Sequence, residues 1–151
     1  MKLVRALLLA LALAPVAASS TPALAADESP SPFTVEVVLV RGSREGTGID
    51  PSLAPFQRDL QALPYTRFTR VGGEAWPARA GASGSATVGG VSVTVEVTAS
   101  APEGVTATVT ATRGGKTVAR TSFSRPWGRA HVVSLGAEGD AILLLPVRVT
   151  R

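Results

Sequence analysis

The sequence VSVTVEVTASAPEGVTATVTATRGGKTVARTSFS, residues 91–124, carries the clearest structural pattern in the chain. Valine stands at every second position from 91 to 97, and valine or alanine alternates with threonine from 105 to 112. A period of two indicates half-buried β-strands and excludes a helix. The segments APEG at 101–104 and RGGK at 113–116 have turn compositions. We therefore predict three antiparallel strands joined by two turns.

The loop of the second hairpin decides which residues of its two strands face each other. A two-residue loop would place Val109 opposite Arg120 and bring a charge to the buried face. A three-residue loop over 113–115 instead places Val109 opposite Ala119, which keeps this face apolar. We predict the three-residue loop, with Gly115 in the left-handed conformation that glycine adopts without steric cost.

The first 25 residues have the parts of a secretory signal peptide. Lys2 and Arg5 precede the apolar run 6–13, and a small-x-small cleavage site ends at Ala25. The apolar run is too short to form a stable anchor in a bilayer. We predict cleavage after Ala25 and a periplasmic or secreted protein with no transmembrane segment in its mature part.

After the signal peptide we predict a flexible lead-in over 26–32 and a single domain over 33–151. The chain has no cysteine, so its stability cannot come from disulfides. Removing Lys2 and Arg5 from the 15 basic residues leaves 13 against 11 acidic ones. A nucleic-acid partner requires a dense basic face with stacking aromatics, whereas these basic residues are scattered. We therefore predict no nucleic-acid binding.

One helix is predicted beyond the signal peptide, with Asp50 as its N-cap and Pro64 just after its end. Apolar residues recur in it at helical spacing: Leu53, Phe56, Leu60 and Leu63. A helix of this length is marginal alone and must lie on a sheet. The expected contact is the second half of the strand over 33–41, which is apolar on both faces.

Further strands are predicted from shorter patterns, with a turn at Gly72 and Gly73 and a flexible tip over 81–85. The final strand is apolar on both faces, which indicates a central place in its sheet. The fold class is therefore mainly β (α+β): an antiparallel sheet or sandwich of about 6–8 strands with one short helix packed on it. The further strands lie over 65–71, 74–80, 130–135 and 141–150.

Catalytic and cofactor motifs lack the structural context that they need. The glycines of 42–48 have the spacing of a short-chain dehydrogenase loop, but strands rather than βαβ units come after them. His131 is the single histidine, and a zinc site draws on several histidine, cysteine or carboxylate ligands. We predict that His131 is either a structural or a rim residue, and we expect no cofactor, no metal and no enzymatic activity.

The order of elements resembles that of small exported bacterial β-rich proteins with no assigned activity. It consists of a strand, the I-D-P-x-L helix start at 49–53, an aromatic strand, the Gly-Gly-Lys hairpin at 114–116 and a final apolar strand. The resemblance implies export and a β-rich fold, and it carries no catalytic residues.

The leading functional hypothesis is an exported, non-enzymatic β-rich interaction module, accessory to a bacterial envelope or secretion assembly. Its candidate binding residues are Arg113, Lys116 and Arg120 near the hairpin end, together with Trp127. Two simpler roles compete with binding: the cations keep a sheet edge solvated against aggregation, and Trp127 closes the core. The alternative function is a small periplasmic hydrolase or ligand-binding protein without a recognised motif. Titratable groups converging in a pocket would favour that alternative.

Overall fold

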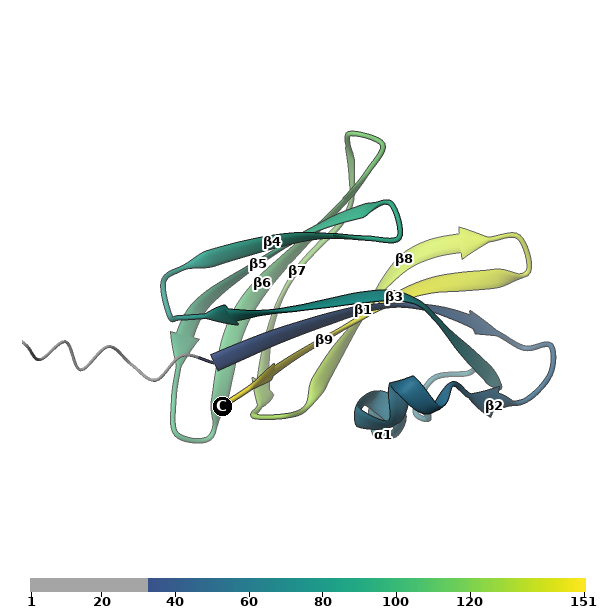
Figure 1. The fold of residues 1–151 in the computed structure, drawn as a ribbon, viewed down its shortest axis with the longest axis horizontal. Helices are drawn as coiled ribbons and strands as arrows, with labels where there is room; N and C mark the ends of the chain where they lie inside the picture. Colours follow the sequence, from purple (N-terminus) through teal and green to yellow (C-terminus); the bar gives the residue numbers. More distant parts are fainter. Residues whose placement is uncertain (1–32) are drawn as a thin grey trace, which may run out of the picture.

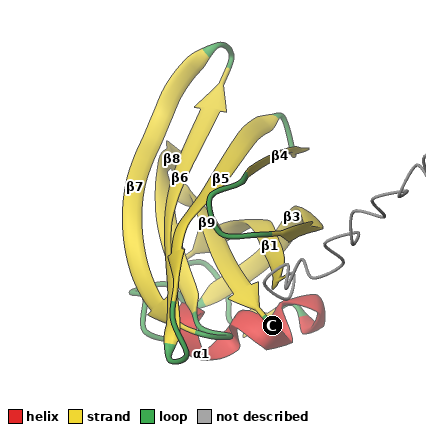
Figure 2. Cartoon of the chain, turned by 90° about the vertical axis from the view of Figure 1, so that its left-hand side faces the viewer, coloured by secondary structure: helices red, strands yellow, loops and turns green. Residues whose placement is uncertain are grey.

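A computed structural model describes residues 33–151. The predicted signal peptide, 1–25, and the lead-in, 26–32, lie outside the described residues. Two β-sheets pack face to face, and one short helix lies against the outer side of one of them (Figures 1 and 2). The predicted mainly β class is confirmed, and of the two predicted arrangements the structure adopts the sandwich.

The five-stranded sheet has the strand order β2-β3-β1-β9-β8. Its neighbouring strands are antiparallel, except that the short β2 runs parallel to β3. The final strand, β9, lies between β1 and β8 with residues buried on both faces, as its sequence predicts. The strands are β1 (Phe33–Ser43), β2 (Gly48–Ile49), β3 (Arg67–Ala78), β8 (Ala130–Glu138) and β9 (Ala141–Thr150).

The four-stranded sheet has the order β4-β5-β6-β7 and contains the three strands predicted from residues 91–124. The sequence pattern did not reveal β4, because the first residues of this strand have the composition of the flexible tip expected over 81–85. The strand is short and ends at the Gly89–Gly90 turn, where both glycines have positive φ. The strands are β4 (Ser83–Val88), β5 (Val91–Ser100), β6 (Gly104–Arg113) and β7 (Lys116–Pro126).

The loop of the β6–β7 hairpin differs from the prediction. Arg113 pairs with Lys116, so Gly114 and Gly115 alone form the loop. Their φ angles are 58° and 77°, so Gly115 does adopt the predicted left-handed conformation. Positive φ at both positions is typical of the two-residue turn whose twist matches that of the flanking strands. This match explains why the shorter loop is adopted.

A β-bulge at Val118 then corrects the register that a two-residue loop would impose. The pairs shift by one residue there, so Val109 lies opposite Thr121 instead of the predicted Ala119. Arg120 pairs with Thr110 on the outer face, so the expected charge on the inner face is avoided. A bulge adds one residue to a single strand, and each later residue of that strand therefore turns to the opposite face.

The predicted turn at Gly72 and Gly73 is also wrong, because β3 runs straight through both residues. Gly72 pairs with Leu39 and Gly73 with Val38 of β1, and Val71 forms a bulge beside them. At Gly72 an added Cβ would lie 3.2 Å from a methyl group of Val88 in β4. Glycine is therefore used here for close approach of the two sheets.

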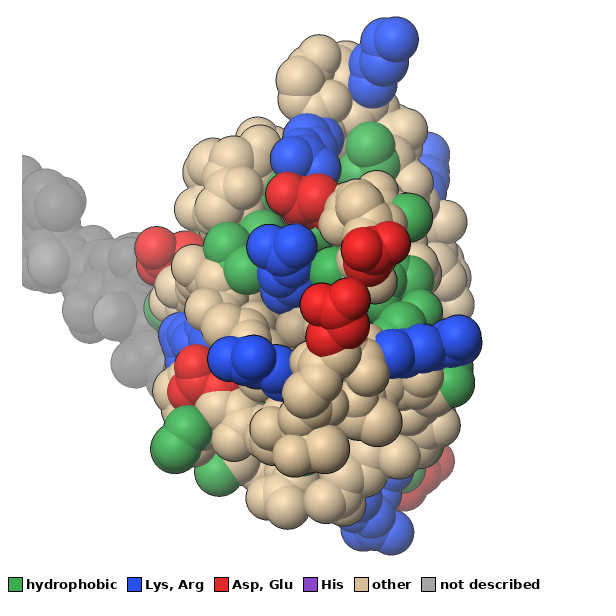
Figure 3. Space-filling view, turned by 90° about the vertical axis from the view of Figure 1, so that its right-hand side faces the viewer, with side chains coloured by type: hydrophobic (Ala, Val, Ile, Leu, Met, Phe, Trp, Pro, Cys, Tyr) green, Lys and Arg blue, Asp and Glu red, His purple; other side chains and the backbone are tan. Residues whose placement is uncertain are grey.

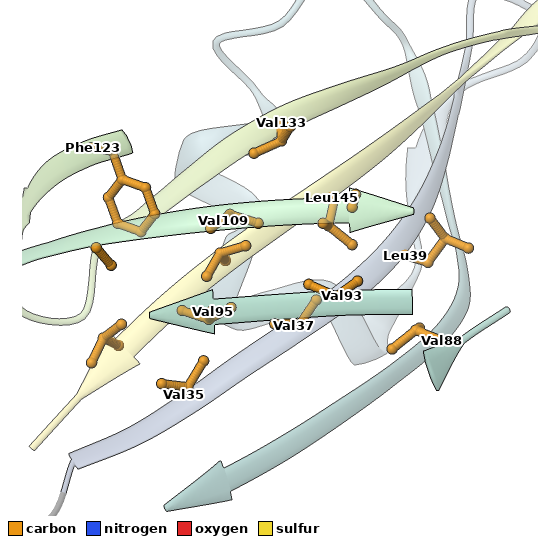
Figure 4. Close-up of a cluster of buried hydrophobic side chains, with 14 of the residues drawn as sticks. Val35, Val37, Leu39, Val88, Val93, Val95, Val109, Phe123, Val133 and Leu145 are labelled. Carbon is orange, nitrogen blue, oxygen red and sulfur yellow. The ribbon is translucent and has the colours of Figure 1, made fainter. Parts of the chain in front are cut away.

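The core between the sheets consists of alternating residues from both layers. Valines at alternate positions of β1 and β5 meet Val109 of β6 and Leu145 of β9 (Figure 4). No polar or charged residue of 33–151 is buried. Each fully buried valine contributes roughly 1.5–3 kcal/mol, so this interior holds the two sheets together.

The helix begins where the sequence predicts and is shorter than expected. It consists of a 3-10 segment, η1 (Pro51–Phe56), followed by α1 (Gln57–Leu60). The Asp50 carboxylate caps it by accepting a hydrogen bond from the Ser52 amide at 2.9 Å. Its three buried apolar residues, Leu53, Phe56 and Leu60, pack on Val38 and Val40 of β1, which confirms the expected contact. No helix within residues 33–151 is long and apolar enough to cross a membrane.

Candidate functional site

The end of the β6–β7 hairpin projects beyond the neighbouring turns of the sandwich (Figures 1 and 2). We call Arg113, Gly114, Gly115 and Lys116 the hairpin tip. The two cations are paired across the strands, so they lie on the same face, and both are exposed. The ion pairs within residues 33–151 are Arg129–Asp59 and Arg148–Glu36, so no carboxylate of this part of the chain neutralises the tip.

Arg120, the third predicted cation, does not join the other two. Along β6, Arg113 lies on the same side as the buried Val109, whereas Arg120 is paired with Thr110 on the opposite side. The Val118 bulge causes this separation, because it offsets β7 by one residue. The structure therefore brings Arg113 and Lys116 together and places Arg120 on the other face of the hairpin.

Trp127 lies at the opposite end of β7 from the tip and packs against the core. The centroid of its ring is 5.4 Å from that of Phe33. The Arg151 guanidinium makes a cation–π contact with Trp127, at 4.4 Å from the centroid of the indole ring. Its indole N–H donates to the carbonyl oxygen of Ala101 at 2.9 Å. These contacts match the role of closing the core, which is the simpler of the two roles expected for this tryptophan.

His131 faces the junction between β7 and β8. Its ring stacks on Phe123 with centroids 4.7 Å apart and an interplanar angle of 17°. Nδ1 of the imidazole lies 3.4 Å from a guanidinium nitrogen of Arg125. Burial lowers the pKa of His131 below its ordinary value, and the charge of Arg125 lowers it further. The neutral imidazole is thus the form that suits this site.

The outer side of the four-stranded sheet is a surface that the sequence patterns did not identify. We call its outward positions on β4, β5, β6 and β7 the hydroxyl face, because serine and threonine occupy most of them. Only Glu96 and Arg120 interrupt the paired rows, which run Thr87–Ser92–Thr112–Thr117, Ser85–Thr94–Thr110–Arg120 and Ser83–Glu96–Thr108–Ser122. The alternating threonines of 105–112 were visible in the sequence. Only the pairing of the four strands shows that these threonines continue into rows of hydroxyl residues across the whole sheet.

A hollow of about 390 Å³ lies at the end of the same sheet that is distant from the hairpin tip. Ala99, Pro126 and the paired Thr106 and Ser124 line it. Glu103 and Arg125 also border the hollow, and they bring one charge of each sign. The hollow combines apolar walls with a few polar groups, which is the usual composition of a small-ligand site.

The charged side chains on the right-hand side of the molecule, as it is oriented in Figure 1, are mixed in sign. Figure 3 shows basic and acidic groups side by side around exposed apolar side chains, with a basic side chain at the top of the molecule.

Within residues 33–151, no group of three or more His, Asp or Glu residues is placed to hold a metal ion. Comparison with protein-family models, with curated proteins and with solved structures finds no match to this chain.

Proposed function

We propose that the chain is an exported, non-enzymatic interaction module that binds an acidic protein surface of an envelope or secretion assembly through the hairpin tip. The predicted signal peptide supports export. The observation that carries the proposal is the pair Arg113 and Lys116 at the end of a projecting hairpin, with no carboxylate of residues 33–151 within ion-pair distance.

The shape of the tip suits contact with a partner. Gly114 and Gly115 have no side chains, so the turn is narrow and the two cations flank it. Attraction between opposite charges on two protein surfaces accelerates their association. Salt weakens this attraction because it screens exposed charges. The interaction is therefore expected to be salt-sensitive.

Two exposed valines offer a matched pair of positions for a photo-crosslinking test. Val118 forms the bulge next to the tip and is 40 % exposed, whereas Val71 forms the bulge in β3 and is 49 % exposed. Each valine is replaced in the exported protein by a photo-crosslinking phenylalanine derivative, which leaves Arg113 and Lys116 in place. Cells are illuminated, and crosslinked products of the envelope fraction are resolved by mass.

We expect a discrete crosslinked species from position 118, at several times the yield obtained from position 71. Adding Arg113→Ser and Lys116→Ser to the position 118 variant is expected to remove it. Equal products from both positions, or a product that survives loss of both cations, would show that the tip is not the contact.

A further inference from the structure

The hydroxyl face has an unusual composition for a solvated sheet surface. Its paired rows contain one acidic residue, Glu96, and one basic residue, Arg120, so the face carries no net charge. Lysine and glutamate, which commonly solvate an outward face, are otherwise replaced by hydroxyl side chains. A neutral face of this kind has no electrostatic preference for an anionic or a cationic polymer, and it complements a neutral ligand.

Several hydroxyl groups are already oriented by contacts with their cross-strand neighbours. The side-chain oxygens lie 2.8 Å apart in the pair Thr106 and Ser124, and 2.8 Å apart in the pair Thr108 and Ser122. A third pair, Ser85 and Thr94, has a separation of 3.0 Å. Each pair uses one of its two O–H donors internally, so one donor and several acceptor lone pairs remain for a ligand. Prior ordering of these groups reduces the entropy lost on binding.

The rows of the hydroxyl face are regularly spaced, so a ligand with a repeating structure can make the same contact at several rows. Neighbouring strands are about 4.8 Å apart, and alternate residues along a strand are about 6.8 Å apart. A single hydrogen bond exchanged with water contributes little, but a chain of repeating hydroxyl groups can engage several rows at once. The hollow of about 390 Å³ at the end of the face adds apolar contact from Ala99 and Pro126 beside Thr106.

We propose that the hydroxyl face binds a neutral polysaccharide, with a sugar unit seated in the hollow and the chain extending over the threonines of β6. The hydroxyl pairs supply both donors and acceptors to sugar hydroxyls, and the apolar wall contacts the C–H face of a sugar ring. This site does not include Arg113 or Lys116, whose side chains lie on the other side of the sheet, so it is independent of the hairpin tip.

Affinity electrophoresis of the mature protein tests the proposal in native gels that contain dextran, laminarin or hydroxyethyl cellulose. A gel with dextran sulfate is the anionic counterpart of the dextran gel. We expect retardation in at least one neutral gel. The triple variant Thr106→Val, Thr108→Val and Thr110→Val is expected to raise the dissociation constant about tenfold, since it removes hydrogen-bonding groups and keeps side-chain shape.

Matched variants separate lost hydroxyl groups from lost structure. Threonine to serine at the same three positions keeps the hydroxyl groups and is expected to retain binding. Thr34→Val removes an exposed hydroxyl group from the other sheet and is expected to have no effect. Should the valine variant fail to fold by circular dichroism, Ser122→Ala with Ser124→Ala on the exposed edge strand takes its place, with weaker binding expected.

The proposal is overturned if no neutral gel retards the protein, or if the valine and alanine variants migrate like the parent in the gel that retards it. Retardation by dextran sulfate alone, removed by Arg113→Ser with Lys116→Ser, would also overturn it and would leave only the hairpin tip as a binding surface.

Discussion

The imidazole of His131 stacks on the ring of Phe123, with an angle of 17° between the two planes. This contact joins the edge strands β7 and β8, which belong to different sheets. The single histidine of the chain therefore lies at a junction that holds the sandwich together, next to the positive charge of Arg125.

The stacked histidine predicts a pH dependence of stability. Its folded-state pKa lies below the ordinary value of 6.5, because burial and Arg125 disfavour the charged form. The unfolded state therefore binds more protons, and stability is full above about pH 6.5 and decreases as the pH falls toward the lowered pKa. Calorimetry between pH 7.5 and pH 5 should show a falling Tm. His131→Phe keeps the stacked ring without the titration, and an equally steep fall in that variant would refute the assignment.

The separation of Arg120 from the tip predicts unequal effects of the three cations on binding. Arg113→Ser with Lys116→Ser should remove the crosslinked species obtained from position 118, and the yield from the parent should fall as the salt concentration rises. Arg120→Ser should leave the yield nearly unchanged, because this side chain lies on the other face of the hairpin. Unchanged crosslinking together with reduced solubility in the tip variant would indicate that these cations serve only to solvate the hairpin.

The two-residue loop predicts which residues position 115 tolerates. Gly115 has a φ of 77°, which strains a residue with a Cβ. Gly115→Ala should lower the free energy of unfolding by about 1 kcal/mol, measured by urea denaturation. Gly115→Asn should cost less, since asparagine is tolerated in the left-handed region. An alanine variant as stable as the parent would mean that the loop has another conformation in solution.

The contact between Gly84 and Trp76 predicts a destabilising substitution in β4. An added Cβ at Gly84 would lie 2.7 Å from Cδ1 of the Trp76 indole and 2.9 Å from Cε2. Gly84→Ala should therefore destabilise the fold by about 1–3 kcal/mol in urea denaturation, because the packed indole must move. A smaller ring relieves the clash, so Gly84→Ala should cost less in a Trp76→Phe background. Equal costs in both backgrounds would contradict this packing.

The small-x-small site that ends at Ala25 predicts the N-terminus of the exported protein. Intact-mass measurement of protein recovered from the periplasm or the medium should match a chain that begins at Ala26. Lys2→Glu together with Arg5→Glu should reduce export, because the signal needs its positive N-terminal region. Exported protein with the mass of the whole chain would contradict cleavage.

Local patterns in the sequence were sufficient for several elements of the fold. The period-two valines of β5 and the doubly apolar β9 were predicted correctly, because strand periodicity and burial on both faces are readable from consecutive residues. Asp50 and the apolar stripe of Leu53, Phe56 and Leu60 likewise predicted the helix and the strand on which it packs. Export stays a prediction from the N-terminal residues.

The register and the surfaces depend on tertiary structure. Gly72 and Gly73 have the composition of a turn, yet pairing with β1 and contact with Val88 keep them within a strand. The bulge at Val118 places the later apolar residues of β7 on the inner face, and it separates Arg120 from Arg113 and Lys116. The hydroxyl face arises only when four strands are aligned. These features depend on contacts between distant residues, and a shift of one residue in pairing reverses which side chains face solvent.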